Sequence, residues 1–514
     1  MAEGLARLGS SRTWTFLALW AATAALGLAW AISTPMVASP DEPAHIFKAA
    51  AVVLGEWMGE PTEQPGFTEV RVPSGVATAW SLTCTAYDES VPASCQGSFP
   101  SGSELLAVQT SAGLYNPTYY ALVGWPSLLT DDPRVAIYAM RALTAVLCGF
   151  FFAIAGTTLL SSAGPLAGLV AYLAILTPTT VFLAGSVNPN AFEVSAAAAL
   201  LAVLLALVRR ADAEIPGSQL ILVAISGVAL ANARGLSLLW MAVIAVIVII
   251  AARSGRMGVL LRSWRVWITL AVLAVGVGLA GLWVLVSNSL GNMGTFAGAG
   301  TVSPGQAFFV MLLERSTDEG LVALFGWLET AGPPIAFALW GFLALAIVFG
   351  AFVVARGRLV WATLAAVAAF FLVPAGVQAA SVEASGYIWQ GRYSLAIYAV
   401  VIVVAAIAGT SIHRAKPTFS SLRAILVIGL SVAAISAFTV LWVIRRYALG
   451  ADGWWGDLIT APQWLPPLGW WPWPLLALSA AAAVVLVAVA AERHRRAGVP
   501  GPDSDDVRTI RPDA

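Results

Sequence analysis

The sequence predicts an all-α polytopic membrane protein, and three observations lead to this fold class. Of the 514 residues, 59% are hydrophobic and only 11% are charged. The mean hydropathy of +0.84 is far above that of a soluble domain of this size. The apolar residues also gather into runs of about 20 residues, the length of a transmembrane helix. Because the net charge is zero, nothing in the composition indicates a nucleic-acid partner.

About twelve apolar runs qualify as transmembrane helices, with both chain ends on the same side. The expected spans are residues 14–33, 134–160, 163–184, 191–208, 219–231, 235–252, 266–286, 334–355, 359–378, 393–409, 422–443 and 473–491. In this topology most of the 27 Lys and Arg fall on one side of the membrane, and most of the 27 Asp and Glu fall on the other. The basic side is predicted to be cytoplasmic.

The topology divides the chain into six segments. They are a cytoplasmic N-terminus with the first transmembrane helix (1–33), an extracytoplasmic loop with an acidic motif (34–133), a transmembrane bundle (134–286), a second extracytoplasmic loop (287–333), the C-terminal transmembrane helices (334–496) and a disordered cytoplasmic tail (497–514). The first loop is too long for a simple connector, so we expect it to have structure of its own. Its two cysteines, Cys84 and Cys95, could pair in an oxidising compartment or stay free.

The first loop opens with two carboxylates, an imidazole and an amine within ten residues, Ser39-Pro40-Asp41-Glu42-Pro43-Ala44-His45-Ile46-Phe47-Lys48. The two prolines predict an extended turn at the acids and a helix that starts at Pro43. Apolar residues recur at helical spacing as far as Trp57, so we expect this helix to lie flat at the membrane surface. The spacing Ser39-x-x-Glu42 also matches a capping box, a purely structural helix start, and both interpretations stay open.

Four short motifs together carry a family resemblance. They are Pro40-Asp41-Glu42-Pro43-Ala44-His45, Asn188-Pro189-Asn190, Gly326-Trp327-Leu328-Glu329 and Gln390-Gly391-Arg392-Tyr393. In their order and placement the sequence resembles family 2142 of the domains of unknown function. These are multi-pass bacterial membrane proteins similar to the C-type glycosyltransferases, which use polyprenyl-phosphate sugars. The resemblance covers most of the chain and implies a C-type fold with an extracytoplasmic active site in the bacterial plasma membrane.

The resemblance implies a catalytic role for the acidic motif. In that superfamily an acid of the first outer loop is the general base toward the acceptor hydroxyl, and Asp41 is the best candidate here. Glu42 would be a second acid or a metal ligand, and a divalent cation (Mg or Mn) is a candidate cofactor. His45 would orient Asp41 or touch phosphate, although a surface histidine without a role fits the pattern equally well.

Basic residues are expected to hold the phosphate of the donor. Arg392 matches a glycine-arginine pair of the family, and a guanidinium there would stabilise the charge of a departing polyprenyl phosphate. Its alternative is an interfacial anchor. Arg141 resembles a basic residue of related enzymes, with an internal ion pair to a loop acid as the alternative. Lys48, from the acidic stretch, is the third candidate.

The other motif residues are candidates for binding the substrate. They are Asn188, Asn190, Gln390, Trp327 and Glu329. The family often has an acid at the position of Asn190, which is better interpreted as a helix N-cap with Glu193 at the third position. Glu329 stands where an aspartate is expected.

The predicted function is an inverting hexosyl- or pentosyltransferase of the membrane. It would move a sugar from a polyprenyl-phosphate donor to a glycan, lipid or protein acceptor of the cell envelope. A transporter or flippase of a lipid-linked glycan is the alternative, and it predicts ionisable groups near the bilayer midplane. A glycan polymerase or ligase would share the lipid-linked donor and also stays open.

Overall fold

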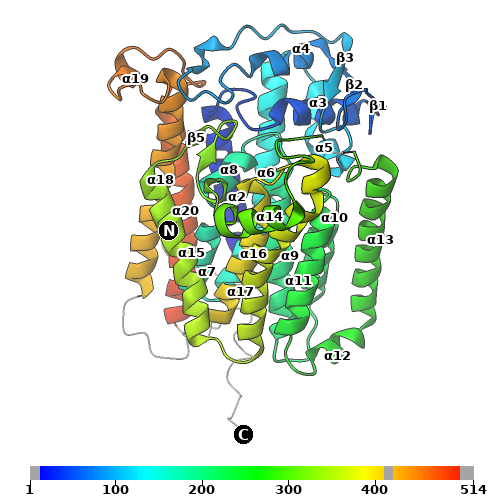
Figure 1. Ribbon diagram of the computed structural model, residues 1–514. Helices are drawn as coiled ribbons and strands as arrows, with labels where there is room; N and C mark the ends of the chain where they lie inside the picture. The colour runs from blue at the N-terminus through cyan, green and yellow to red at the C-terminus, as the bar shows by residue number, and fades with distance from the viewer. Residues whose placement is uncertain (1–11, 293, 410–420, 498–514) are drawn as a thin grey trace.

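The computed structural model describes residues 12–292, 294–409 and 421–497. Long helices stand side by side as a bundle, and one end of the bundle is covered by loops, short helices and short strands (Figure 1). Within the described residues, nine helices are long and apolar enough to cross a membrane, or ten if the bent pair α7–α8 is one span. The protein is therefore a polytopic helical membrane protein, as the sequence predicts. The count of twelve would also need the two shorter apolar helices α10 and α11, and it stays a prediction.

The long helices begin and end close to the apolar runs of the sequence. They are α2 (Arg12–Ser33), α6 (Pro133–Ser162), α9 (Asn190–Arg209), α13 (Trp264–Ser287), α15 (Pro334–Val354), α16 (Arg358–Ser385), α17 (Leu395–Ala408), which reaches the length of a span together with the short helix η6 (Gly391–Ser394) before it, α18 (Ser421–Leu449) and α20 (Pro472–Arg496). The shorter ones are α7 (Pro165–Ile175), α8 (Pro178–Ala184), α10 (Gly217–Ala231), α11 (Ser237–Ala251) and α12 (Arg256–Leu261). The predicted tail and the first eleven residues lie outside the described residues, apart from Ala497.

Small residues let the central helices approach closely. A methyl group added at Gly27 of α2 would meet Ala145 of α6 at 2.9 Å, and one added at Gly149 would meet Ala24 at 3.0 Å. Close backbone approach of this kind is the usual basis of helix pairing in lipid, where no hydrophobic effect drives association. α9 and α17 are the most enclosed spans, while α13 and α15 are mostly exposed, and α13 stands at the edge of the bundle (Figure 1). The site described below is attached to the enclosed helices.

The run 163–184, predicted as one span, is broken. Helices α7 and α8 meet at a bend of 66°, and Pro178 is the first residue of α8. The hydroxyl of Thr177 accepts a hydrogen bond from the backbone N–H of Thr180 and so caps the second helix. Proline cannot donate a helical hydrogen bond and disfavours helical geometry in the residue before it. The apolar composition of the run gives no sign of this break, but Thr177 and Pro178 specify it.

The first loop is folded over one end of the bundle. It contains an antiparallel sheet of β1 (Glu60–Pro61), β2 (Thr68–Pro73) and β3 (Leu105–Thr110), in the order β1-β2-β3. It also contains the helices α3 (Glu42–Val53), α4 (Ser74–Ala77) and α5 (Pro117–Val123). Alternate residues of β2 are buried, as expected of a strand with one covered face. The hydroxyl of Thr110 donates to the carbonyl of Ala44 at 2.8 Å, which ties the sheet to α3.

Helix α3 is covered more completely than a helix lying flat on a membrane would require. Every residue from Glu42 to Val52 is buried, and the helix ends at Val53, so Trp57 lies beyond it and is exposed. The predicted extent to Trp57 is therefore wrong, while the interfacial location stays a prediction. The second loop contains α14 (Pro304–Val310) and a hairpin of β4 (Leu324–Phe325) and β5 (Thr330–Ala331).

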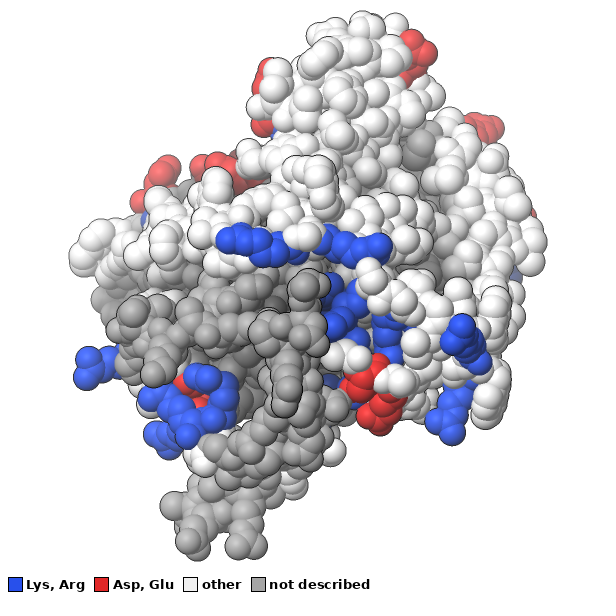
Figure 2. All heavy atoms as spheres, turned by 90° about the horizontal axis from the view of Figure 1, so that it is seen from below, with Lys and Arg blue, Asp and Glu red and all other residues white. Residues whose placement is uncertain are grey.

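The two ends of the bundle differ in charge. Figure 2 shows the end opposite the folded loops, where arginines gather with few acids beside them. Three arginines there donate to backbone carbonyls at helix ends: Arg209 to Ala251, Arg358 to Ala252 and Arg256 to Leu207. Carbonyls at helix C-termini carry partial negative charge, so guanidinium groups stabilise them.

Candidate functional site

Asp41 occupies a tight turn immediately before α3. Its backbone has φ +63°, the left-handed conformation, which aspartate tolerates better than most residues. The N–H of Glu42 donates to the carbonyl of Ser39 at 3.2 Å, and the N–H of His45 donates to the carbonyl of Asp41. The predicted extended turn is therefore wrong. The capping box is wrong too, because the Ser39 hydroxyl has no hydrogen-bond partner and Glu42 bonds elsewhere.

Glu42 forms a sealed ion pair with Arg141 of α6. The guanidinium donates to both carboxylate oxygens, at 2.7 Å from Nε and 2.6 Å from Nη2. Its other hydrogen bonds go to three carbonyls at the end of α2 and just beyond, those of Ala31, Thr34 and Pro35. Both side chains are almost wholly buried, at 1% and 0% exposure. All five guanidinium donors are used, so Arg141 has none left for a phosphate.

This pair bears on two predictions. The structural alternative for Arg141, an ion pair with a loop acid, is the one observed. Glu42 also accepts the backbone N–H of Val187 at 2.9 Å, so its oxygens are occupied by protein donors. The pair joins α2, α3, α6 and the segment before α9 at one point. It has the geometry of a structural ion pair, and the roles of Glu42 as a second acid or a metal ligand stay predictions.

Asp41 pairs instead with Arg392, which lies in the short helix η6 (Gly391–Ser394) that leads into α17. The Arg392 Nη2 to Asp41 Oδ2 distance is 2.6 Å. The guanidinium side chain is only 3% exposed, whereas the carboxylate side chain is 43% exposed. Arg392 also donates from Nε to the Gln390 side chain at 2.6 Å and from Nη2 to the Tyr393 hydroxyl at 3.1 Å. Gln390 therefore orients the arginine.

The charges around Asp41 keep its carboxylate ionised. Burial alone would raise the pKa of Asp41, but the Arg392 guanidinium, with smaller effects from His45 and Arg234, lowers it below its usual value. A partly exposed carboxylate beside a buried cation is the arrangement that a proton acceptor needs, provided that a ligand can take over the cation.

Arg234 is a member of this cluster that the sequence does not assign to the site. It follows α10 in the polar break Asn232-Ala233-Arg234, and its guanidinium lies 4.7 Å from the ring centroid of Tyr393. Arg392 lies 5.0 Å from the same ring. Glu193 of α9 pairs with Arg234 at 3.4 Å and accepts the Ser237 hydroxyl at 2.7 Å. Two cations therefore flank one phenol ring beside Asp41. The polar break between two short apolar helices was the available signal.

His45 is buried, and the surface interpretation is wrong. Its exposure is 3%, its Nδ1 lies 2.8 Å from the Tyr120 hydroxyl, and its ring contacts Tyr115 edge-on. Burial lowers the pKa of His45 to about 3, and the positive Arg392 and Arg234 act in the same direction against Asp41. The imidazole is therefore neutral at physiological pH and offers no cation to a phosphate.

Lys48 ties α3 to the rest of the loop. Its ammonium donates to the carbonyl of Gly113 at 2.6 Å and to that of Trp57, and it lies 5.5 Å from the ring centroid of Trp283. Burial lowers its pKa to about 7. These partners belong to the loop and to α13, so Lys48 is not brought together with Arg392, and its predicted phosphate contact stays untested.

Asn188 and Asn190 lie next to the turn that contains Asp41 and Glu42. The Asn188 amide donates to the carbonyl of Pro40 at 3.2 Å, and its oxygen accepts the N–H of Asn190 at 3.0 Å. The N-cap position of α9 is Pro189, with Asn190 already helical, so the predicted cap by the Asn190 side chain is wrong. Asn188 is bonded to the protein through both its amide nitrogen and its oxygen, while the Asn190 side-chain oxygen is buried without a partner.

Trp327 and Glu329 approach the same turn from the second loop. The indole N–H of Trp327 donates to the carbonyl of Val37 at 3.0 Å. Glu329 accepts the Thr330 hydroxyl at 3.0 Å and lies 3.5 Å from Arg446 of α18, but its Oε2 is buried and has no partner. Burial raises the pKa of Glu329, against the charge of Arg446.

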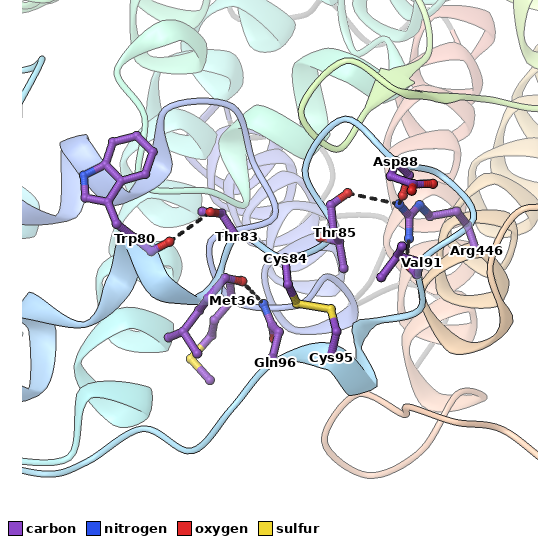
Figure 3. Close-up of a disulfide and its surroundings, with 11 residues drawn as sticks. Met36, Trp80, Thr83, Cys84, Thr85, Asp88, Val91, Cys95, Gln96 and Arg446 are labelled. Atoms are coloured by element: carbon purple, nitrogen blue, oxygen red, sulfur yellow. Dashed lines mark hydrogen bonds between the residues drawn. A yellow bond between two sulfur atoms is a disulfide. The ribbon is translucent and has the colours of Figure 1, made fainter.

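A disulfide shapes the part of the first loop that faces Trp327. Cys84 and Cys95 are joined, so the pairing that the sequence left open is formed. Figure 3 shows Arg446 reaching into this loop. Its guanidinium donates to the carbonyls of Thr85, Asp88 and Val91, at 3.3, 2.7 and 2.7 Å. The loop is thus closed by a covalent bond and held against α18.

The described residues do not offer an obvious cation site. No group of three or more His, Cys, Asp and Glu side chains with the spacing of metal ligands occurs among them. Asp41 and Glu42 are each engaged by an arginine, and a guanidinium in that position opposes a metal ion. The predicted Mg or Mn dependence is untested, and no chemical step below uses it.

Two adjacent apolar cavities lie on the lipid side of α10. They have volumes of about 410 and 400 Å³ and share Ala224, Ile225 and Val272. One extends toward Thr118 of α5 at the folded loop, the other toward Arg265 at the basic end. Neither is lined by Asp41 or Arg392, and both suit hydrocarbon.

The fold and the site together define a multi-pass membrane protein in which paired acids and arginines lie under a folded loop. Residues 25–401 match the family described as predicted membrane protein (DUF2142). The chain belongs to this family, and the resemblance seen in the sequence is confirmed. No curated protein matches the chain.

The chain is also similar to solved membrane-protein structures. ArnT from Cupriavidus metallidurans bound to undecaprenyl phosphate aligns over 94% of this chain and 78% of its own, at 12% identity and a TM-score of 0.44. The apo state of the same protein aligns over 95% and 79%, at 15% identity and a TM-score of 0.39. The apo oligosaccharyltransferase of Archaeoglobus fulgidus aligns over 87% of this chain and 57% of its own, at 12% identity and a TM-score of 0.40.

Proposed function

We propose that the protein is an integral membrane glycosyltransferase. It transfers a hexosyl or pentosyl group from a polyprenyl-phosphate donor to a glycan, lipid or protein acceptor of the cell envelope. The observation that carries the proposal is the pair of a partly exposed Asp41 carboxylate and a buried Arg392 guanidinium, 2.6 Å apart. The pair supplies a base and an anion-binding group at one place.

The proposed reaction is a single displacement with inversion. The acceptor hydroxyl gives its proton to the Asp41 carboxylate while its oxygen forms a bond to the anomeric carbon. The bond from that carbon to the phosphate oxygen breaks, and polyprenyl phosphate leaves with the electron pair. Arg392 stabilises the negative charge that develops on the leaving phosphate. The general base contributes on the order of 10²–10⁴-fold to the rate.

Donor binding would prepare Asp41 for this role. Arg392 holds the carboxylate pKa down, and a phosphate that binds Arg392 competes with the carboxylate for the guanidinium. Neutralising that cation raises the pKa of Asp41 and makes it a better proton acceptor. Arg234, which lies 4.7 Å from the centroid of the same Tyr393 ring as Arg392, would share the phosphate charge.

Three features support the bacterial plasma membrane and an extracytoplasmic site. The disulfide between Cys84 and Cys95 belongs to the loop that covers Asp41, and disulfides persist in oxidising compartments. The opposite end of the bundle is rich in arginine, which favours the cytoplasmic side. The apolar cavities beside α10 suit an isoprenoid tail.

Membranes of a deletion strain test the proposal, because they supply the acceptor. Labelled polyprenyl-phosphate hexoses and pentoses are added with purified wild type or Asp41→Asn protein, and label in glycan, lipid and protein is measured. Asp41→Asn is expected to lower transfer on the order of 10²-fold or more. The rates are compared per folded molecule, because the substitution also leaves the buried Arg392 without its counter-ion. Equal transfer by both proteins contradicts the proposal. If label crosses vesicle membranes equally well with both proteins and is not transferred, the transporter or flippase alternative holds.

The same assay separates transfer of one sugar from polymerisation. A transferase adds one labelled residue to each acceptor, whereas a glycan polymerase or ligase adds preassembled chains from a lipid-linked oligosaccharide. Only products larger than one residue would favour that alternative.

A further inference from the structure

We propose that an aromatic cluster on the extracytoplasmic loops binds the acceptor as a carbohydrate, with Glu329 as its polar contact. The cluster consists of Trp80 and Tyr87 of the first loop and Trp327 of the second. The inference rests on the proposed function in naming the bound sugar the acceptor, but sugar binding itself is testable without turnover.

The three rings are arranged around Trp327. The ring centroid of Trp327 lies 5.7 Å from that of Trp80 and 5.7 Å from that of Tyr87, with interplanar angles of 49° and 65°. Trp327 is 6% exposed, whereas Trp80 is 36% and Tyr87 is 74% exposed. The buried ring of Trp327 therefore packs against two rings that are partly or largely exposed. Aromatic faces that stay exposed beside a few polar groups are typical of ligand sites.

Carbohydrate is the ligand chemistry that this surface suits. The C–H faces of a sugar ring stack on tryptophan and tyrosine, and its hydroxyls donate to carboxylates. Glu329 supplies such a carboxylate two residues after Trp327. Its side chain is 9% exposed, and its Oε2 makes no hydrogen bond of standard geometry. We expect a sugar hydroxyl at the exposed edge of this side chain to donate to the carboxylate.

The cluster adjoins the proposed base. The Tyr87 ring packs on Trp327, and the indole N–H of Trp327 is bonded to the carbonyl of Val37, four residues before Asp41. Trp327 thus links Tyr87 to the segment that leads into the Asp41 turn. Burial is the main cause that raises the pKa of the Tyr87 phenol, and the charges of Asp41, Arg392 and Glu329 also act on it.

Backbone strain gathers at the same place. Among the described residues, six that are not glycine have positive φ. Four of them lie in the cluster, next to it or in the segment that ends at Asp41: Val37, Asp41, Tyr87 and Leu328, with φ of 57°, 63°, 63° and 75°. Such conformations persist where the surroundings fix them. For Tyr87 the fixing contacts are the disulfide and the three bonds from Arg446 to the loop carbonyls.

Binding is measured by saturation-transfer NMR on protein in lipid nanodiscs, with a panel of methyl hexopyranosides and methyl pentofuranosides as probes. Tyr87→Ala is expected to raise the dissociation constant of the bound glycoside about tenfold, the equivalent of about 1.4 kcal/mol. Tyr87→Phe keeps the ring and should bind as wild type does. Trp454→Ala is the matched control, because Trp454 is 70% exposed and lies outside the cluster.

Three results would overturn the inference. They are no binding of any glycoside by the wild type, equal binding by Tyr87→Ala and wild type, and an equal loss in Trp454→Ala. Glu329→Gln, which keeps the shape and removes the charge, should weaken binding less than Tyr87→Ala does. Asp41→Asn should bind the glycosides as wild type does. If it binds them but still transfers sugar, the proposed function fails while this inference stands.

Discussion

Asp41 and Glu42 are neighbours in the sequence and both pair with an arginine, yet the two pairs lie in opposite environments. The Glu42–Arg141 pair is sealed, with side-chain exposures of 0% and 1% and every guanidinium donor bound to protein. The Asp41–Arg392 pair is open on the side of the acid, which is 43% exposed. The comparison teaches that an ionic partner does not define a role. Exposure and the saturation of the partner distinguish a structural pair from a reactive one.

Breaking the Glu42–Arg141 pair should have the largest effect on the stability of the protein. Glu42→Gln leaves the Arg141 charge buried without its counter-ion, which is expected to cost about 3–5 kcal/mol in the free energy of unfolding. The drop in melting temperature in detergent or nanodiscs measures this effect. The double variant Glu42→Met, Arg141→Met removes both charges and should recover most of the loss. If Glu42→Gln melts at the wild-type temperature, the pair is not the structural ion pair described here.

The stability of the folded protein should depend on pH through His45, four residues after Asp41. The pKa of His45 falls from 6.5 to about 3 on folding because of burial. Between those values the unfolded chain binds a proton that the folded protein does not, so stability falls as the pH is lowered below 6.5. One such group contributes about 1.4 kcal/mol for each pH unit. His45→Gln should flatten the melting temperature between pH 7 and pH 5, and an unchanged slope would contradict the burial of this imidazole.

Arg392→Lys should have the smallest effect and should sharpen the distinction between the two arginines. A lysine keeps the charge but cannot bind Gln390, Asp41 and a phosphate in one plane. The KM for the polyprenyl-phosphate donor is expected to rise about tenfold, about 1.4 kcal/mol, with little change in melting temperature. Arg445→Lys is the control, because Arg445 donates to the loop carbonyls of Ala451 and Gly453. A donor KM that is equal for Arg392→Lys and wild type would remove Arg392 from the site.

The sequence predicts the membrane class and most helix positions, because hydropathy and proline placement are local signals. It does not predict which acid is sealed. Glu42 meets Arg141 across 99 positions, and the choice depends on the carbonyls left at the end of α2. Pro178 indicates the break between α7 and α8, but the apolar run around it led to the prediction of one continuous span.

Other parts of the site were outside the reach of local patterns. Asn188 resembles a substrate ligand in the sequence, yet its amide holds the carbonyl of Pro40. Arg234 stands in a polar break, and only the tertiary fold brings it to the ring of Tyr393. Tyr87 lies in a disulfide loop whose conformation depends on Arg446, a residue of a helix near the other end of the chain.

The most direct test of the account compares transfer per folded molecule in Asp41→Asn and Glu42→Gln, both assayed below their melting temperatures. The account predicts that Asp41→Asn loses about 10²-fold or more of the transfer rate per folded molecule. It should melt closer to wild type than Glu42→Gln does, because the Asp41 side chain is 43% exposed. Glu42→Gln should melt lower and keep most of its rate per folded molecule. The reverse pattern, with an active Asp41→Asn and an inactive but stable Glu42→Gln, would contradict the assignment of Asp41 as the base.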